Sequence, residues 1–306
     1  MSSLVVFDAL MFSNLLVLLS LSLTLTYMTL KIPNFAHGDY ATVGAYIVQT
    51  LNVVAGLNYY VSLPLSFVTG GLTALLSYIL VFYPLSKRGA DITSLMIASF
   101  ALSTAISSVL CIYADYMTLL TGGFFRTFSF NDFKVDFFGW KTFLLLPFTT
   151  GLVATLLLLL YLLLNYTRLG IAMRATVENP DLAETLGIDV NKTRAVAWFL
   201  AGGLAGLAGG LLPFRLLTSP ALGSFILIRI FAASVLGGLN SLAGAVLGGY
   251  IVGFSEILGI YLLSQPPIYL STAYRPAIPF IMLIVTLLVA PQGISGVLKL
   301  KGGSRR

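Results

Sequence analysis

The sequence has little charge and almost no cysteine or histidine. Only 9% of its 306 residues are charged, whereas 58% are hydrophobic, and the mean hydropathy is +0.97. A soluble domain carries about 25% charged residues, so a water-soluble globular protein is excluded. Cys111 is the only cysteine and His37 the only histidine. An internal disulfide and a Cys-rich metal site are therefore excluded. With a single histidine, a His-based metal cluster is excluded and a hydrolytic triad is not expected.

Two sequence signals are also missing. No P-loop pattern (GxxxxGK[ST]) occurs, so we expect the chain not to bind ATP in that way. The first residues, MSSLVVFDAL, lack the positive n-region of a cleavable signal peptide, so the first apolar run is expected to be a retained helix. The net charge of +6 is expected to mark cytoplasmic ends rather than nucleic-acid binding. We expect no catalytic residue, no metal site and no cofactor in this chain.

The apolar runs predict an all-α polytopic membrane bundle that forms one transmembrane domain over 1–306. Runs of about 20 residues fit helices that span a hydrocarbon core of about 30 Å, whereas a β-barrel would show alternating segments of about ten residues. We expect about eight crossings, with Asp91 as the N-cap of the fourth. Their approximate ranges are 9–30, 36–51, 61–83 (ending before Pro84), 91–113, 142–165, 194–217, two helices within 225–263 that separate near Gly237 and Gly238, and 273–290, which Pro291 and Gly293 end.

Lys and Arg residues orient this arrangement. Eleven of the 17 fall on one side and five on the other, while Arg229 lies within a crossing. The larger set should be cytoplasmic, which places the N-terminus outside and the C-terminus inside. The loop at about 114–141 is then outer and rich in aromatic residues. Phe128-Ser129-Phe130 with Asn131-Asp132 predicts a short β-hairpin there, and an interfacial aromatic belt is an equal alternative.

The polar segment at about 165–194 stands out in this apolar chain and is expected to be a cytoplasmic loop. Asp181 to Leu186 can form a short helix that Gly187 closes. Leu182 and Leu186 are four residues apart and share one face. Such a helix suits a groove on a partner; the alternative is a helix that lies on its own membrane domain.

A second candidate region surrounds the second crossing. Pro33 and Gly38 make a continuous helix unexpected there, and broken helices at membrane depth often line transport pathways. Asn34 and Asp39 would face such a pathway; alternatively they cap a helix near the interface. We assign Asn34, Gly38, Asp39, Gly237 and Gly238 to the candidate translocation pathway.

Two charged residues lie inside predicted crossings. Arg229 and Glu256 fall at compatible depths, and an isolated charge at membrane depth is costly, so an ion pair between them is expected. A proton or cation site at Glu256 is the alternative.

Glycines recur every four residues at 202, 206 and 210, at 244 and 248, and at 249 and 253. This spacing favours close helix packing.

Several ordered motifs resemble those of the branched-chain amino acid (LIV-type) permeases of ABC importers. Asp181-Leu182-Ala183 and Gly187 stand at the Glu-Ala-Ala and Gly positions of the family's cytoplasmic coupling loop, with Asp in place of Glu and Leu in place of the first Ala. The other motifs run from about residue 20 to 298: Asn34 to Gly38 with Gly44-Ala45-Tyr46, Thr167 to Gly170 with Arg174-Ala175, Leu186-Gly187-Ile188, Ala205 to Gly209, Val235 to Ser241, and Pro291 to Gly296.

The resemblance implies a permease that translocates branched-chain or related amino acids by alternating access. It implies a second homologous permease subunit, two cytoplasmic ABC ATPase subunits that use ATP and Mg, an extracytoplasmic solute-binding protein, and surrounding membrane lipids. Arg174, Asp181, Leu182, Ala183, Leu186 and Gly187 are then the residues expected to couple to the ATPase. A secondary transporter or a channel for small neutral solutes is the competing class.

Overall fold

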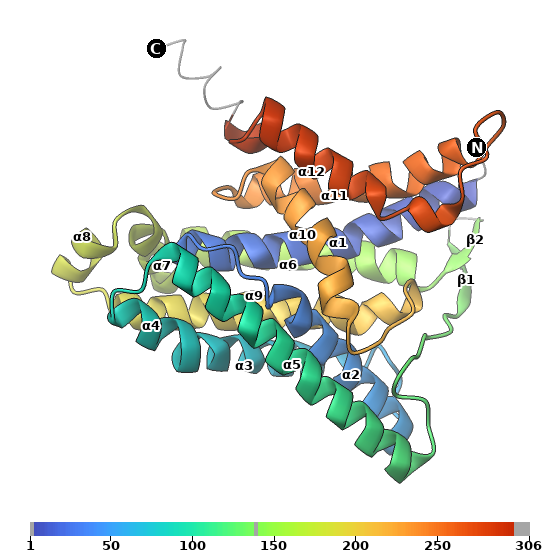
Figure 1. Cartoon of the computed structure of the whole chain (residues 1–306), viewed down its shortest axis with the longest axis horizontal. Coiled ribbons are helices and arrows are strands. Elements are labelled where there is room, and N and C mark those ends of the chain that lie inside the picture. The colour runs from blue at the N-terminus through green and yellow to red at the C-terminus, as the bar shows by residue number, and fades with distance from the viewer. Residues whose placement is uncertain (1–2, 138–139, 297–306) are drawn as a thin grey trace. The chain divides into compact units, whose positions relative to one another are not determined.

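The computed structural model describes residues 3–137 and 140–296 (Figure 1). The chain divides into two compact units. Unit 1 comprises Met1–Thr24, Phe130–Val153 and Ile226–Arg306, and unit 2 comprises Leu25–Ser129 and Ala154–Phe225. The described α-helices are α1 (Ser3–Leu30), α2 (His37–Ala55), α3 (Leu63–Ser77), α4 (Tyr83–Lys87), α5 (Ile92–Thr121), α6 (Leu145–Tyr166), α7 (Arg168–Glu178), α8 (Pro180–Thr185), α9 (Val190–Leu211), α10 (Leu222–Gly237), α11 (Leu242–Leu263) and α12 (Ala277–Val289).

The helices confirm the predicted class of fold. Among the described residues, seven helical stretches are long and apolar enough to cross a membrane, and α10 is a shorter apolar helix. The nine predicted ranges, one more than the eight crossings expected, each hold a helix in the described chain, with α10 and α11 in 225–263; α2, in the second range, is not among the seven stretches. The separation falls where expected, because Gly238 adopts φ +100° directly after α10. The seven stretches are Leu4–Leu30, Leu63–Lys87, Ile92–Thr121, Leu145–Tyr166, Val190–Phe214, Leu242–Leu263 and Thr272–Gly296.

The third crossing does not end before Pro84, as predicted. A π-helical turn, η1 (Tyr78–Phe82), joins α3 directly to α4, and Pro84 lies in the first turn of α4. Proline has no N–H and its ring clashes with a preceding carbonyl in a regular α-helix. The wider π turn changes the local hydrogen-bond pattern immediately before the proline, so the helical path continues to Lys87.

The fourth crossing is longer than the predicted 91–113. The paired strands of the following loop lie after residues 128–132, where the hairpin was predicted. The Asp91 N-cap is confirmed, since its side chain accepts from the Ser94 N–H (3.2 Å). Helix α5 continues to Thr121, where Gly122 ends it at φ +68°. The two strands are β1 (Lys134–Phe137) and β2 (Trp140–Phe143), paired antiparallel. Phe128 instead forms an isolated bridge with Thr218 in unit 2.

Unit 2 is built on close contacts between α2, α3 and α9, which lie side by side (Figure 1). A Cβ added to Gly206 would lie 2.9 Å from the Gly70 Cα, and one added to Gly44 would collide with the Gly206 backbone. One glycine face of α9 thus meets two helices at backbone contact distance, as small-xxx-small spacing allows. The packing role predicted for the α9 glycines is confirmed, since a Cβ on Gly202 would also collide with α3 and one on Gly210 would lie 2.9 Å from Val48 of α2.

Unit 1 uses the same device between α1 and α11. A Cβ on Gly249 would lie 2.7 Å from the Val17 Cα, and one on Gly253 would lie 2.7 Å from the Ser13 Cα. The Ser20 hydroxyl donates to the Ala245 carbonyl across the same contact (2.9 Å). Close backbone approach and a buried hydroxyl bond therefore hold these helices together.

Candidate coupling and translocation sites

Side-chain caps divide the polar segment between α6 and α9 into short helices. Thr167 caps α7 by accepting from the Gly170 N–H, Asn179 caps α8, and Asp189 caps α9. Pro180 occupies the first position of α8, where a missing N–H costs nothing. The backbone N–H and side chain of Lys192 both hydrogen-bond Asp189 and hold the pKa of that carboxyl below its ordinary value.

Helix α8 ends as the sequence predicts. Gly187 has φ +82°, which confirms the left-handed residue expected there. The Gly187 N–H donates to the Glu184 carbonyl (2.9 Å) and the Ile188 N–H donates to the Ala183 carbonyl (3.0 Å). These bonds satisfy carbonyls that the helix end leaves open.

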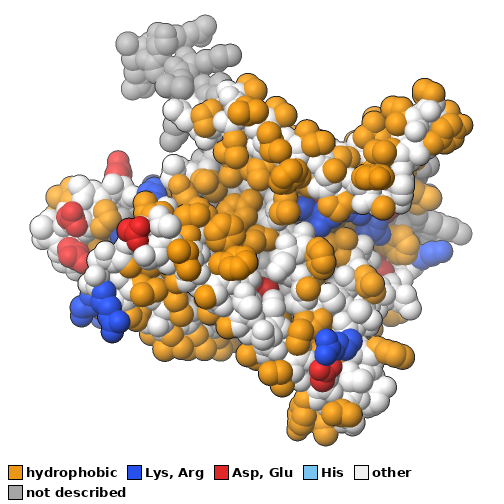
Figure 2. Space-filling model, in the orientation of Figure 1, with side chains coloured by type: hydrophobic (Ala, Val, Ile, Leu, Met, Phe, Trp, Pro, Cys, Tyr) orange, Lys and Arg blue, Asp and Glu red, His pale blue; other side chains and the backbone are white. Residues whose placement is uncertain are grey.

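Helix α8 presents two leucines and hides its alanine. The side chains of Leu182 and Leu186 are 57% and 71% exposed, whereas Ala183 is 1% exposed. Ala183, one of the residues expected to couple to the ATPase, faces its own chain rather than solvent. The exposed residues around the leucines include the acidic Asp181, and Figure 2 shows charged side chains of both signs at the end of unit 2 where α4 and α8 lie in Figure 1.

Helix α7 folds back tightly onto the end of α6. A Cβ on Gly170 would collide with the backbone of Leu163 and Leu164. The Arg174 guanidinium donates to the Asn165 side chain at 3.3 Å across this bend. Arg174 therefore helps hold α7 against α6, and its side chain lies on the exposed surface.

The candidate pathway segment is a loop followed by an unbroken helix. The side-chain Oδ1 of Asn34 accepts from the Ala36 N–H (3.1 Å), and its side-chain Nδ2 donates to the Tyr40 hydroxyl (3.3 Å). Helix α2 begins at His37 and runs through Gly38, so the predicted break at Gly38 is wrong. Gly38 instead packs directly on the Gly223 backbone, which explains the need for glycine.

Asp39 lies in the first turn of α2 and contacts α5. Its side chain is 0% exposed. The Ser103 and Ser107 hydroxyls donate to its two oxygens at 2.5 and 3.0 Å. Sequence reasoning missed both serines. Their spacing of four residues, which Ser99 extends to a third position, was the available signal.

Gly237 and Gly238 form the turn between α10 and α11. Gly237 packs on the Gly244 backbone, and a Cβ on Gly293 would lie 2.5 Å from the Gly238 Cα. Both glycines are buried in unit 1. Their contacts account for glycine as packing, and their assignment to the pathway stays a prediction.

Glu256 joins two arginines in unit 1. Arg229 Nε lies 3.0 Å from both carboxylate oxygens, and Arg275 Nε lies 2.6 Å from Oε1. Glu256 is 0% exposed. The Arg275 guanidinium also stacks over the Phe12 ring, 4.5 Å from its centroid. Sequence reasoning missed Arg275, at the start of the predicted crossing 273–290, as this third member.

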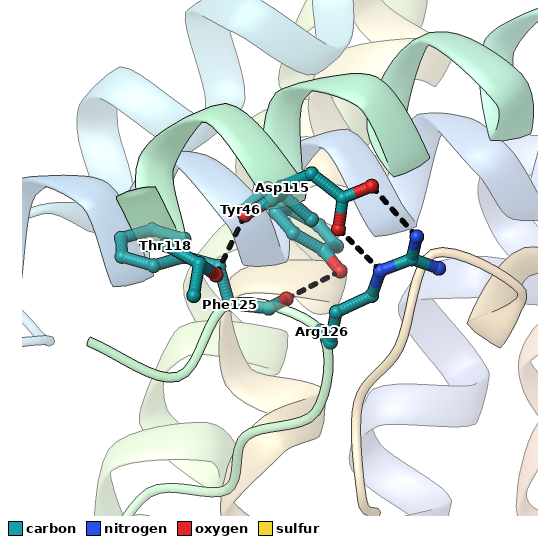
Figure 3. A network of polar contacts seen from close by, with 6 residues as sticks. Tyr46, Asp115, Thr118, Phe125 and Arg126 are labelled. Atoms are coloured by element: carbon teal, nitrogen blue, oxygen red, sulfur yellow. Dashed lines mark hydrogen bonds and ion pairs between the residues drawn. The ribbon is translucent and has the colours of Figure 1, made fainter. Parts of the chain in front are cut away.

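A polar network ties the loop after α5 to two helices of unit 2 (Figure 3). The Tyr46 hydroxyl donates to the Phe125 carbonyl (2.9 Å), and Arg126 meets Asp115 through two bonds of 2.5 and 2.7 Å. The ion pair is exposed and contributes little to stability. Tyr46, buried and edge-on to Phe128, is the stronger anchor of the loop.

The described helices form the arrangement of a multi-pass membrane protein. Among residues 3–137 and 140–296, no three His, Cys, Asp or Glu side chains come together to hold a metal. Long apolar helices and glycine-packed cores are typical of a multi-pass membrane protein.

Comparison with known proteins gives the family. Residues 5–287 match the family model described as "Branched-chain amino acid transport system / permease component". A probable branched-chain amino acid transport permease protein, LivH of Methanocaldococcus jannaschii, is 47% identical over 94% of this chain and 91% of its own length. BraD of Pseudomonas aeruginosa, a high-affinity branched-chain amino acid transport system permease, is 28% identical over 91% of each chain. The chain therefore belongs to the branched-chain amino acid permease family, and it is a multi-pass prokaryotic membrane protein.

One solved structure shares the fold. PsaBC of Streptococcus pneumoniae, solved in complex with a Fab, matches 96% of this chain and 94% of its own with a TM-score of 0.52 and 16% identity. At that identity the likeness shows the fold alone.

Proposed function

We propose that this chain is one of two permease subunits of an ATP-driven importer for branched-chain or related amino acids. Family membership supports a transport role, and the names of LivH and BraD supply the substrate class. The apolar composition of the helices suits neutral, partly apolar solutes.

Helix α8 is the observation that carries the proposal. It projects two exposed leucines from a polar segment that three N-caps hold in place. A soluble partner with an apolar groove would bury Leu182 and Leu186. In this proposal the partner is an ABC ATPase, and ATP with Mg is bound and hydrolysed there, since the chain itself has no P-loop.

Motion then passes from the ATPase into unit 2. Helix α8 follows α7, which packs tightly on the end of α6, and α9 begins at the Asp189 cap. A displacement of α8 by the ATPase would therefore move α6 through α7, and α9 through the segment that the Asp189 cap ends. The helices switch between inward-facing and outward-facing states, and an extracytoplasmic binding protein delivers the solute to the outward-facing state.

Co-purification tests the proposal against a secondary transporter or channel. A tagged permease should retain two ATPase subunits and a second permease subunit in mild detergent, and uptake into vesicles should require internal ATP. Uptake that proceeds without ATP and without a bound ATPase would favour the competing class.

A further inference from the structure

The Asp39 carboxylate is buried against the middle of α5, one of the helices long and apolar enough to cross a membrane, and its partners are hydroxyl groups. Ser103 and Ser107 of α5 each donate to one of its oxygens. An intramembrane carboxylate of this kind normally pairs with a basic group or faces a functional site. Asp39 has hydroxyl partners instead of a basic one, so it could bind a cation that is not part of the chain.

The helices around Asp39 bring no basic side chain to it. In the described part of the chain, the carboxylate has no Lys or Arg contact. The other acidic and basic side chains of α2 and α5 are His37 and Asp115. His37 contacts the Tyr40 ring edge-on, and Asp115 pairs with Arg126. The four residues of α10 that belong to this unit, 222–225, carry no charge.

Two helix N-termini lie next to the Asp39 carboxylate and favour its negatively charged form. Asp39 lies in the first turn of α2, and Gly223 in the first turn of α10 packs directly on its side chain. Helix N-termini favour negative charge. The absence of a side chain at Gly223 is what lets the second terminus approach so closely.

The hydroxyls make the site suitable for a primary ammonium. A serine that donates its proton to Asp39 still has lone pairs to accept hydrogen bonds, and an ammonium has three donors to offer. Ca²⁺ takes six to eight oxygen ligands, several of them commonly carboxylates, and among the described residues no group of three or more His, Cys, Asp or Glu side chains occurs that could hold a metal ion. Ser107 is only half-buried and its neighbours Thr104 and Ser108 are exposed, so the site lies close to the open face of α5.

We infer that Asp39, Ser103 and Ser107 form the subsite that receives the α-ammonium of a neutral amino acid during translocation. The inference rests on the proposed function, since it assumes that an amino acid passes through this chain. It adds the group that selects zwitterionic solutes over uncharged or purely anionic ones of the same shape.

Binding of three matched probes to the purified permease–ATPase complex, without binding protein, tests the inference. Leucine carries both charged groups, 3-methylbutylamine keeps only the ammonium, and 4-methylpentanoate keeps only the carboxylate. The wild type should bind labelled leucine, and the amine should compete while the acid should not. Asp39→Asn should weaken leucine and amine binding about tenfold or more, the size expected for loss of a charged hydrogen-bond partner.

Milder variants keep the test valid if Asp39→Asn fails to assemble. Ser107→Ala should weaken leucine and amine by several fold and leave the response to 4-methylpentanoate unchanged. Thr69→Ala is the control, because the Thr69 hydroxyl donates only to carbonyls of its own helix α3. Competition by 4-methylpentanoate in the wild type would overturn the inference. So would unchanged leucine and amine binding in Asp39→Asn, or in Ser107→Ala where Asp39→Asn does not assemble.

The proposed function has its own point of failure. If wild-type vesicles show no ATP-driven leucine uptake, the substrate class is wrong, whereas direct binding of labelled 3-methylbutylamine to the wild type and to Asp39→Asn still reports on the subsite. If uptake is normal in the wild type and in Asp39→Asn, the importer function is supported and the ammonium subsite is contradicted.

Discussion

Leu182 and Ala183 are consecutive residues of α8 that face in opposite directions, the leucine into solvent and the alanine into its own chain. One face of this short helix is therefore part of unit 2, and the other is open to a partner. A substitution on either face should impair transport, but for different physical reasons.

The pair Leu182→Glu and Ala183→Glu should separate these reasons. Leu182→Glu adds a charge to an exposed surface, so thermal stability should stay within about 0.5 kcal/mol of the wild type while ATPase binding is lost. Ala183→Glu buries an unpaired charge and should destabilise the chain by several kcal/mol. Thermal melting in detergent beside a pull-down of the ATPase measures both. Equal stability of the two variants would show that Ala183 is not buried.

Gly44 should tolerate no side chain, because an added Cβ collides with the Gly206 backbone of α9. Gly44→Ala must separate two helices and should cost about 2 kcal/mol or more of stability. Gly151→Ala in α6 is the matched control. Nothing lies within 4 Å of a Cβ there, so the change should be neutral or stabilise by up to about 1 kcal/mol. Similar melting temperatures for the two variants would contradict the close packing of α2 and α9.

The contact between Arg229 and Glu256 should appear as a coupling energy in a double-mutant cycle. Glu256→Gln leaves the buried Arg229 and the half-buried Arg275 facing a neutral group, and Arg229→Gln leaves the acid with Arg275 alone. Removing both should cost less than the sum of the single losses, by about 1 kcal/mol or more. Because Arg275 remains, the double variant should not regain full stability. Strictly additive losses would mean that the two side chains do not interact.

The orientation of the chain stays a prediction of the charge pattern. In a variant without Cys111, a cysteine at Asn58 in the loop after α2 should be labelled from outside by an impermeant maleimide. A cysteine at Thr185 in α8 should be labelled only after the membrane is opened. Both positions are exposed, so access depends on the side of the membrane. Labelling of Thr185→Cys from outside would invert the arrangement.

The sequence predicted best what depends on local chemistry. Caps such as Asp91, the left-handed Gly187 and the glycine repeats of α9 follow from the preferences of single residues and from spacing, and all are present. The contacts of Glu256 with Arg275, and of Asp39 with Ser103, join residues far apart in the chain and need the folded helices to become visible. The break expected at Gly38 failed for a related reason, since its glycine serves a neighbouring backbone, Gly223, rather than a bend in its own helix.

The most direct test of the coupling role is ATP hydrolysis and uptake by the reconstituted transporter with Gly187→Val. Valine resists φ +82°, so the end of α8 should shift while the membrane helices stay intact. Gly89→Val is the matched control, because Gly89 has φ +75° and equally open surroundings in the turn before α5. Both variants should lose a similar small amount of stability. Uptake and the stimulation of ATP hydrolysis by loaded binding protein should fall together in Gly187→Val and persist in Gly89→Val. Normal uptake and stimulation in Gly187→Val would contradict the proposal that α8 transmits the motion of the ATPase.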